Sequence, residues 1–248
     1  MQATAEKIAA PPSPQPGGGK SRSGVLRRLL RWIFRLALLL LLLLAGLVAL
    51  WAVAPPVSTL MLGRWAAFRP VERQWVPLER ISPNLIAAVV MSEDGQFCRH
   101  NGVDWKALDE QINAEDGPAR GASTIPMQVA KNLFLWPQRS FIRKGLELPL
   151  ALVLAKAWPR RRILEVYLNI AEWGDRGLFG AEAAARRYFG KSAVNLTRRE
   201  AALLATALPN PFIRNPARPR RHHLKLAQIN MARARGAGPW LDCLKEKT

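Results

Sequence analysis

The chain of 248 residues is poor in the residues that build metal centres and disulfide scaffolds. It has two cysteines, Cys98 and Cys243, and three histidines, of which His222 and His223 are adjacent. Two cysteines cannot make a disulfide-rich fold or a four-cysteine zinc site, and adjacent histidines lack the spacing of metal ligands on a helix. A catalytic metal site of histidine and cysteine is therefore not expected. The sequence leaves open whether the two cysteines pair with each other.

Acidic residues are also scarce, because 18 Asp and Glu face 37 Lys and Arg and leave a formal charge of +19. With an apolar content of 49%, the composition excludes an acidic disordered chain. No segment repeats at a period of roughly 20–50 residues, which excludes a long repeat array. The basic charge favours anionic partners such as lipid headgroups, phosphates and diphosphates, although charge alone would equally fit nucleic acid.

Charge is absent from 19 consecutive residues, Leu36–Ala54, and most of them are leucine. As a helix this run would be about 28 Å long, which is close to the hydrocarbon thickness of a bilayer. The run has no polar face, and this favours a membrane span over a buried amphipathic helix. Trp32 and Trp51 near its ends suit the level of the headgroups. We therefore predict a transmembrane anchor over 29–54.

The orientation of this anchor follows from the charge before it, since residues 1–35 carry seven Lys and Arg and only one acid, Glu6. The positive-inside rule places the basic, Pro/Gly-rich tail 1–28 in the cytoplasm and the rest of the chain outside the inner (plasma) membrane. A cleaved signal peptide is the alternative, because Ala52-Val53-Ala54 resembles a cleavage site. The apolar run exceeds the usual core of about 7–15 residues, which favours the anchor. An exported domain does not meet the chromosome, so no nucleic-acid partner is expected.

Helix signals dominate the remaining chain, which we divide into a linker over 55–80 and a domain over 81–248. No stretch alternates at period two, so strands should be minor and the fold class mainly α. Caps, glycines and prolines bound several apolar patterns of helical spacing. One predicted helix starts at Ser82-Pro83 and runs into Ser92–Gly95, and a second starts at Ser123-Thr124. The others cover roughly 143–157, 161–172, 180–189 and 201–208, the last one behind a capping box at Thr197 and Glu200.

Polar residues interrupt this helical pattern first at Glu93 and Asp94, which follow an apolar helix. The negative end of the helix dipole and partial burial would both raise the pKa of a carboxyl group there, as a general base requires. A solvated pair of acids at a helix end is the alternative that position alone leaves open.

Two further polar groups lie on later helices. A stripe rich in donors, suited to an anion or a sugar, consists of Thr124, Gln128 and Lys131 with Asn132 beside it, although an ordinary solvent-facing helix would look the same. Arg143 and Glu147 are spaced i,i+4. They form either a surface ion pair worth roughly 0.3–0.5 kcal/mol or a phosphate-binding cation with a second carboxylate.

Together these segments resemble the motifs of the peptidoglycan glycosyltransferases. Glu93–Gly102 is similar to their ED-x-x-F-x-x-H-x-G motif, and Gly121–Asn132 to G-x-S-T-I-x-Q-Q-x-x-K-N. Arg143–Glu147 matches R-K-x-x-E, Ile163–Asn169 matches I-L-E-x-Y-L-N, and Gly180–Ala205 resembles the last block. Five matches in the family's order are specific.

Two departures from the family pattern concern single residues. Met127 stands where the family has the first Gln of its Q-Q pair, so a donor is lost there, and Arg160 replaces a Lys with its charge kept. The chain has no S-x-x-K or K-T-G motif. The resemblance is therefore to monofunctional members rather than to the bifunctional penicillin-binding proteins, which add a transpeptidase.

The resemblance implies a lysozyme-like, all-α domain that polymerises lipid II into linear glycan strands for cell wall biogenesis and cell shape. The acceptor 4-hydroxyl would attack the donor anomeric carbon with inversion, and undecaprenyl diphosphate would leave. Glu93 would be the general base and Glu147 a second catalytic carboxylate, while Lys131 and Arg143 would stabilise the diphosphate. Further substrate-binding and diphosphate-binding residues implied by the resemblance are Asp94, Phe97, His100, Ser123, Thr124, Gln128 and Asn132.

The same resemblance implies the partners: lipid II, the growing glycan chain, membrane lipid, and cell-wall synthesis or division proteins. No cofactor is expected to be obligatory, although Mg or Mn could assist at the diphosphate. Glu165 and Asn169 are expected to brace the fold rather than to react. Two other functions stay open, namely a lytic, lysozyme-like enzyme that cleaves glycan and a non-catalytic scaffold that binds envelope polymer.

Overall fold

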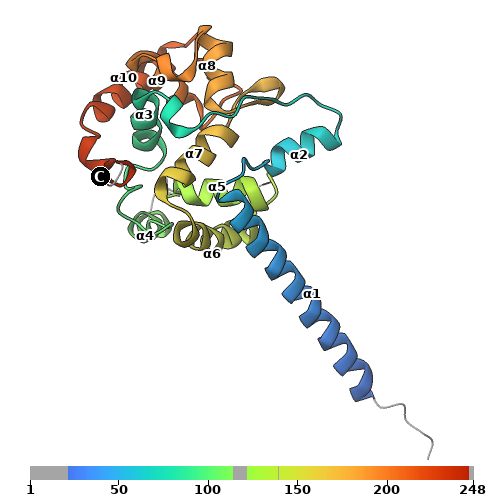
Figure 1. The fold of residues 1–248 in the computed structure, drawn as a ribbon. Helices are drawn as coiled ribbons and strands as arrows, with labels where there is room; N and C mark the ends of the chain where they lie inside the picture. The colour runs from blue at the N-terminus through green and yellow to red at the C-terminus, as the bar shows by residue number, and fades with distance from the viewer. Residues whose placement is uncertain (1–21, 114–121, 139, 246–248) are drawn as a thin grey trace, which may run out of the picture. The chain divides into compact units, whose positions relative to one another are not determined.

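The computed structural model describes residues 22–113, 122–138 and 140–245 (Figure 1). The chain divides into two compact units, one that ends at Leu47 and one that begins at Val48. Most of the basic tail predicted over 1–28 lies outside the described residues, as does Gly121 of the second motif.

Helix α1 (Arg22–Trp51) makes up the described part of the first unit and ends with one turn in the second. Within its stretch Gly24–Trp51, a window of 18 residues has a mean hydropathy of 2.8, and the side chains are mostly exposed. By length and composition the helix could cross a membrane, as the sequence predicts for 29–54.

Two groups of packed helices build the second unit. The first group is α3 (Pro83–Glu93), α9 (Arg198–Ala207) and α10 (Arg221–Arg235); the second is α5 (Ile125–Phe134), α6 (Phe141–Ala157) and α7 (Arg160–Ile170). In the view of Figure 1, α7 is the helix of the second group that lies toward the first. The mainly α fold class is confirmed.

The strands are short, as expected, and form one small sheet of order β1-β3-β2, in which β3 is parallel to β1 and antiparallel to β2. The remaining elements of the described chain are α2 (Thr59–Ala66), α4 (Trp105–Ile112), α8 (Ala181–Phe189), β1 (Glu72–Arg73), β2 (Glu172–Gly174), β3 (Leu178–Phe179), and the 3-10 turns η1 (Leu78–Arg80), η2 (Asp175–Gly177), η3 (Ala193–Asn195), η4 (Gly238–Trp240) and η5 (Asp242–Leu244).

Side-chain caps explain where the helices begin. The Ser82 hydroxyl accepts from the Asn84 N–H at the start of α3, and Thr124 accepts from the Met127 N–H at the start of α5. The capping box predicted before α9 is present. Helix α6 begins at Phe141, two residues earlier than predicted, because Ser140 caps it.

Residues 55–80, which the sequence suggests are a linker, fold with the second unit instead. Helix α2 lies in this segment, its Met61 is fully buried, and the Thr59 hydroxyl donates to the Leu135 carbonyl at 2.7 Å. The prolines of the segment suggested a linker, whereas the apolar side chains between them supply a buried face.

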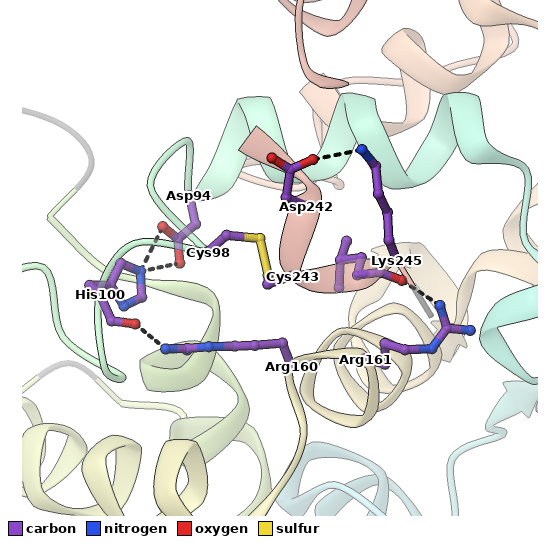
Figure 2. The surroundings of a disulfide bond; sticks show 9 residues. Asp94, Cys98, His100, Arg160, Arg161, Asp242, Cys243 and Lys245 are labelled. Carbon is purple, nitrogen blue, oxygen red and sulfur yellow. Dashed lines mark hydrogen bonds and ion pairs between the residues drawn. A yellow bond between two sulfur atoms is a disulfide. The ribbon is translucent and has the colours of Figure 1, made fainter. Parts of the chain in front are cut away.

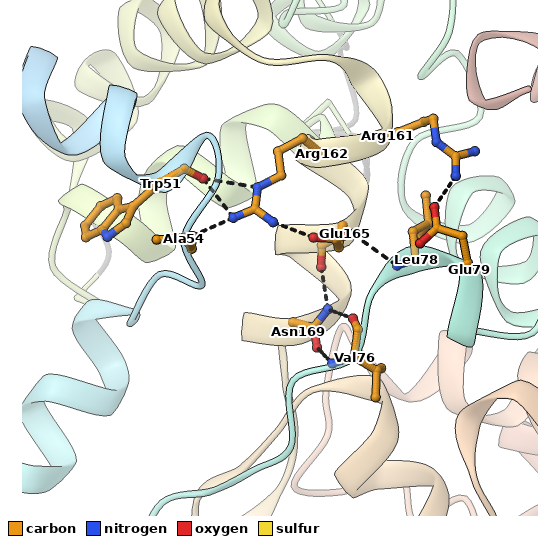
Figure 3. A network of polar contacts seen from close by, with 9 residues as sticks. All are labelled: Trp51, Ala54, Val76, Leu78, Glu79, Arg161, Arg162, Glu165 and Asn169. Carbon is orange, nitrogen blue, oxygen red and sulfur yellow. Dashed lines mark hydrogen bonds and ion pairs between the residues drawn. The ribbon is translucent and has the colours of Figure 1, made fainter. Parts of the chain in front are cut away.

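Helix α7 ties several segments together through its polar face (Figure 3). The Arg162 guanidinium donates to the Trp51 carbonyl at 2.9 Å and pairs with Glu165. Glu165 accepts from the Leu78 N–H at 3.0 Å, while the Asn169 amide both accepts from and donates to the Val76 backbone at 2.9 Å. Glu165 and Asn169 therefore hold the backbone of Val76 and Leu78 against α7.

Cys98 and Cys243 form a disulfide that connects the loop after α3 to η5 (Figure 2). The sequence left this pairing open. Because the bond closes a loop across a sequence separation of 145 residues, it removes considerable conformational freedom from the unfolded chain.

We expect Cys243→Ser to lower the free energy of unfolding by about 2–5 kcal/mol, since the unfolded chain regains this freedom. Thermal unfolding of the detergent-solubilised chain measures the effect. A thiol reductant should lower the midpoint of the natural chain in the same way and leave the Cys98→Ser/Cys243→Ser variant unchanged. Equal midpoints with and without reductant would contradict the prediction.

Candidate active site

Glu93, the last residue of α3, is a half-buried acid whose environment favours its protonated form. Its Oε2 accepts from the Gln128 Nε2 at 3.2 Å, and the Ser92 hydroxyl donates to its Oε1 at 3.4 Å. Burial raises the pKa of Glu93 and the Asp94 charge adds to this, whereas the two hydrogen bonds and the Lys131 charge oppose it. The result is a carboxyl group with raised proton affinity, as a general base needs.

The Gln128 side chain is held in place by Tyr167 of α7. The Tyr167 hydroxyl donates to the Gln128 Oε1 at 3.2 Å, so the amide turns its NH₂ group toward Glu93. Tyr167 is buried, and burial together with the charges of Glu93 and Asp94 raises its pKa well above 10. The hydroxyl therefore keeps its proton and acts as a permanent donor.

Asp94 is buried and organises the loop after α3. Its Oδ2 accepts from the Ile125 N–H at 2.9 Å, at the favourable N-terminal end of α5. The His100 Nε2 lies 2.9 Å from the Asp94 Oδ1, and the Gly102 N–H donates to the His100 Nδ1 at 3.2 Å. In the neutral ring the Nε2 atom therefore carries the hydrogen, and this N–H donates a hydrogen bond to the Asp94 carboxylate.

Gly102 allows this loop to approach α6. Its φ is +100°, and a Cβ atom there would lie 2.7 Å from the Ala151 carbonyl oxygen. Phe97 of the same loop is fully buried, with the Arg160 guanidinium 5.5 Å from its ring centroid. The structure thus gives Phe97 a place in the core, where it has no surface to offer the ligand that the sequence interpretation assigned to it.

The predicted donor stripe of α5 divides into residues that face the site and residues that hold the helix. The Thr124 hydroxyl is engaged in the helix cap and donates to the Gly102 carbonyl at 2.6 Å, and Asn132 is buried. Met127, which replaces the family's Gln, packs with Val103 and Ala151 in the core. Gln128 and Lys131 remain as the residues that act on Glu93.

A cluster of cations surrounds Glu147 on α6. Arg143 forms an ion pair with Glu147, and both residues are buried, with exposed fractions of 8% and 3%. The Lys144 ammonium lies 3.3 Å from the Glu147 carboxylate and donates to the Ser123 hydroxyl at 2.6 Å. The simple surface ion pair that the sequence left open is therefore excluded.

Lys131 belongs to the same electrostatic group. Burial lowers its pKa first of all, the charges of Arg143 and Lys144 lower it further, and those of Glu147 and Glu93 raise it. The structure thus brings the predicted residues Glu93, Lys131, Arg143 and Glu147 together. Any negative charge placed between these cations would be strongly stabilised.

A cleft of about 450 Å³ opens beside Glu93. It is lined by Met91, Ser92, Glu93, Asp94, Gly95, Gln96, Asp104, Ser123, Thr124, Arg233 and Trp240. Ser123 connects the cleft to the cation cluster, because its hydroxyl accepts from Lys144. Among the described residues, no group of three or more His, Cys, Asp or Glu side chains is arranged to hold a metal ion.

Among the residues of this site that sequence reasoning missed are Lys144, Tyr167, Arg233 and Trp240. Lys144 and Tyr167 lie inside two of the quoted motifs and were readable there, although nothing in the sequence placed them beside Glu93. Arg233 and Trp240 carry no such signal, since both follow the last of the motifs.

The site places a carboxyl group of raised pKa beside a group of fixed cations within a helical domain, an arrangement suited to an enzyme that moves a proton and stabilises an anion. The sequence matches the family model for transglycosylases over residues 61–235, and the chain belongs to this family.

Relatives at 53–56% identity bear one name, biosynthetic peptidoglycan transglycosylase. The protein of Brucella melitensis is 55% identical over 192 residues, which are 77% of this chain and 85% of the relative. The Agrobacterium fabrum protein is 53% identical over 191 residues (76% and 84%), and that of Rhodospirillum centenum 56% over 196 residues (78% and 84%).

The hydrogen bond from Gln128 lowers the pKa of Glu93, and this contribution can be tested. Gln128→Leu should raise the pKa of Glu93 further, because a hydrogen bond to the charged form is lost. An NMR titration of the Glu93 carboxyl carbon measures this. The control Gln228→Leu, at an exposed position of α10, should leave the pKa unchanged. An unaltered Glu93 titration in Gln128→Leu would refute the assignment.

The burial of the Arg143–Glu147 pair predicts a large loss of stability when one partner is removed. Arg143→Ala should cost about 1.5–3 kcal/mol of unfolding free energy, since the buried Glu147 carboxylate loses its charged hydrogen bond to Arg143 and keeps only the longer contact with Lys144. The control is Lys106→Ala, which breaks the i,i+4 pair with Glu110, whose side chains are 88% and 66% exposed. It should cost less than about 0.5 kcal/mol. Urea unfolding in detergent measures the unfolding free energy of both variants. Equal losses would show that the Arg143–Glu147 pair contributes no more than an exposed surface pair.

Proposed function

We propose that this chain is a peptidoglycan glycosyltransferase that joins lipid-linked disaccharides, lipid II, into linear glycan strands. Membership of the transglycosylase family and the shared name of the relatives support this function. The observation that carries the mechanism is the raised pKa of Glu93 in a cleft next to the Lys131 and Arg143 cations.

In the proposed reaction, the 4-hydroxyl of the acceptor sugar gives its proton to the Glu93 carboxylate. The hydroxyl oxygen forms a bond to the anomeric carbon of the donor sugar, whose bond to the lipid diphosphate breaks with inversion. The electron pair of that bond goes to the diphosphate oxygen. Gln128, fixed by Tyr167, holds the Glu93 carboxylate in one orientation while the proton moves.

The leaving diphosphate gains negative charge as its bond to the sugar breaks, and the cations of α5 and α6 would stabilise it. Lys131, Arg143 and Lys144 outnumber the one carboxylate among them, Glu147. Glu147 holds Arg143 and Lys144 in fixed positions, so little reorganisation is needed when the charge develops. Glu147 is thus a positioning group in this mechanism.

The membrane supplies a substrate with a lipid tail, and α1 would keep the enzyme at its surface. We propose the orientation with the N-terminus in the cytoplasm, which the excess of Lys and Arg before the apolar run supports. The Cys98–Cys243 disulfide supports it independently, since such bonds persist in oxidising compartments outside the cytoplasm.

Helix α6 offers a second contact with lipid. Phe141, Ile142 and Leu146 are exposed apolar residues on this helix, with exposed fractions of 97%, 74% and 42%. The same helix carries Arg143 and Glu147 of the cation cluster. Apolar side chains of this kind on a surface helix suit the boundary between headgroups and acyl chains. The diphosphate of a membrane-bound substrate would then lie close to the cations.

Glu93→Gln tests this function, because glutamine keeps the shape of the side chain but does not act as a base. We expect purified natural protein to make polymer from lipid II and to release nothing from cell-wall sacculi. Glu93→Gln should polymerise at least about 100-fold more slowly, the usual range for loss of a general base. The control Glu110→Gln, at an exposed position of α4, should retain the natural rate.

The stability of Glu93→Gln separates loss of chemistry from loss of fold. Because the pKa of Glu93 is raised, the folded chain binds this proton more tightly than the unfolded chain does. Stability therefore falls as the pH rises from the ordinary pKa through the raised one. Glutamine does not ionise, so the Glu93→Gln variant does not lose this stability. At neutral pH its unfolding temperature should be no lower than that of the natural protein. Unchanged polymerisation by a folded variant would reject Glu93 as the base, and cleavage of sacculi would favour a lytic enzyme.

A further inference from the structure

One wall of the Glu93 cleft comes from the last residues of the family match and from the chain just beyond them. Arg233 lies in the last turn of α10, and Trp240 ends η4, five residues beyond the matched range 61–235. Both residues line the same cleft as Glu93 and Ser123. The catalytic motifs therefore do not enclose the cleft alone.

This wall is fastened to the loop that follows Glu93 by two neighbouring contacts. The Cys98–Cys243 disulfide joins the loop to η5, as Figure 2 shows. The Arg99 guanidinium lies 3.5 Å from the centroid of the Trp240 ring. Covalent and cation–π contacts at adjacent residues thus fix the position of the Trp240 ring relative to the end of α3.

Arg233 is the charged residue of the cleft that lacks a partner. It is exposed, and within the described part of the chain no carboxylate lies within ion-pair distance of its guanidinium. The three carboxylates that line the cleft are engaged elsewhere. Glu93 accepts from Gln128, Asp94 accepts from His100 and from the start of α5, and Asp104 caps α4 through the Ala107 N–H at 3.1 Å. The guanidinium donors of Arg233 are therefore available to a ligand.

We propose that Arg233 and Trp240 form a substrate subsite beside Glu93, in which a sugar ring packs against the indole and an anionic group of the same substrate binds the guanidinium. The proposal rests on the proposed function, because that function brings a disaccharide to Glu93. The indole offers an apolar surface to the C–H face of a sugar. The planar guanidinium offers paired donors to a phosphate or a carboxylate. Lipid II carries both anions, in its diphosphate and in its peptide.

The test compares Arg233→Ala with a control variant from the same helix turn. Arg235 is also exposed, two residues further along, and does not line the cleft. With the full-length protein in detergent, Arg233→Ala should raise the KM for lipid II about ten-fold, the effect of losing a charged hydrogen bond. Arg235→Ala should stay within about two-fold of the natural protein, as surface changes usually do. High salt should narrow the difference, because it screens the same attraction.

Two further measurements identify what the subsite holds. Trp240→Ala should raise the KM as well, whereas Trp240→Phe, which keeps an apolar ring, should restore it. A lipid II analogue without its peptide identifies the anion. If the Arg233→Ala defect disappears with this analogue, the guanidinium binds a peptide carboxylate; if it persists, the guanidinium binds the diphosphate.

The outcomes separate this subsite from the proposed function. If the natural protein polymerises lipid II while Arg233→Ala and Arg235→Ala share its KM, the subsite is overturned and the function stands. If Trp240→Ala and Trp240→Phe raise the KM equally, the sugar contact is overturned. A natural protein that makes no polymer would overturn the function and the subsite together.

Discussion

The hydrogen bond between Gln128 and Glu93 is the contact on which the rest of the site depends. It connects the two helix groups of the second unit, because Glu93 ends α3 and Gln128 lies in the middle of α5. A carboxylate that loses water on burial needs a donor, and here the donor amide is itself oriented by the Tyr167 hydroxyl of α7. Three helices thus determine the position and the proton affinity of one oxygen atom.

The cation cluster follows a second constraint, which is that buried like charges repel. Lys131, Arg143 and Lys144 can share one site only because Glu147 lies among them, and three cations still face this one carboxylate. Burial is the main cause of the lowered pKa of Lys131, and the charges of Arg143 and Lys144 lower it further. A diphosphate would correct this imbalance. The excess positive charge of this cluster therefore suits an anionic ligand, while the repulsion among the cations lowers the stability of the folded chain without one.

Local signals made much of this fold predictable. Ser82, Thr124 and the Thr197–Glu200 box start helices through contacts within three residues, so the sequence reveals them. Helix α2 was missed because the burial of Met61 depends on distant segments, and the basic helix α10 because its pattern has few apolar residues. The motifs located Glu93 and Arg143, whereas the roles of Tyr167, Arg233 and Trp240 arise from contacts between segments far apart in sequence.

The disulfide also imposes an order on how this enzyme matures. Cys243 is synthesised 145 residues after Cys98, so the bond can form only when α4 to α10 already exist and both thiols have reached an oxidant. Until then, the segment that bears Trp240 is held by noncovalent contacts alone. Completion of the cleft is thereby a late, oxidative event, and a newly made chain that still faces a reducing compartment would have Glu93 in place before the neighbouring wall is secured.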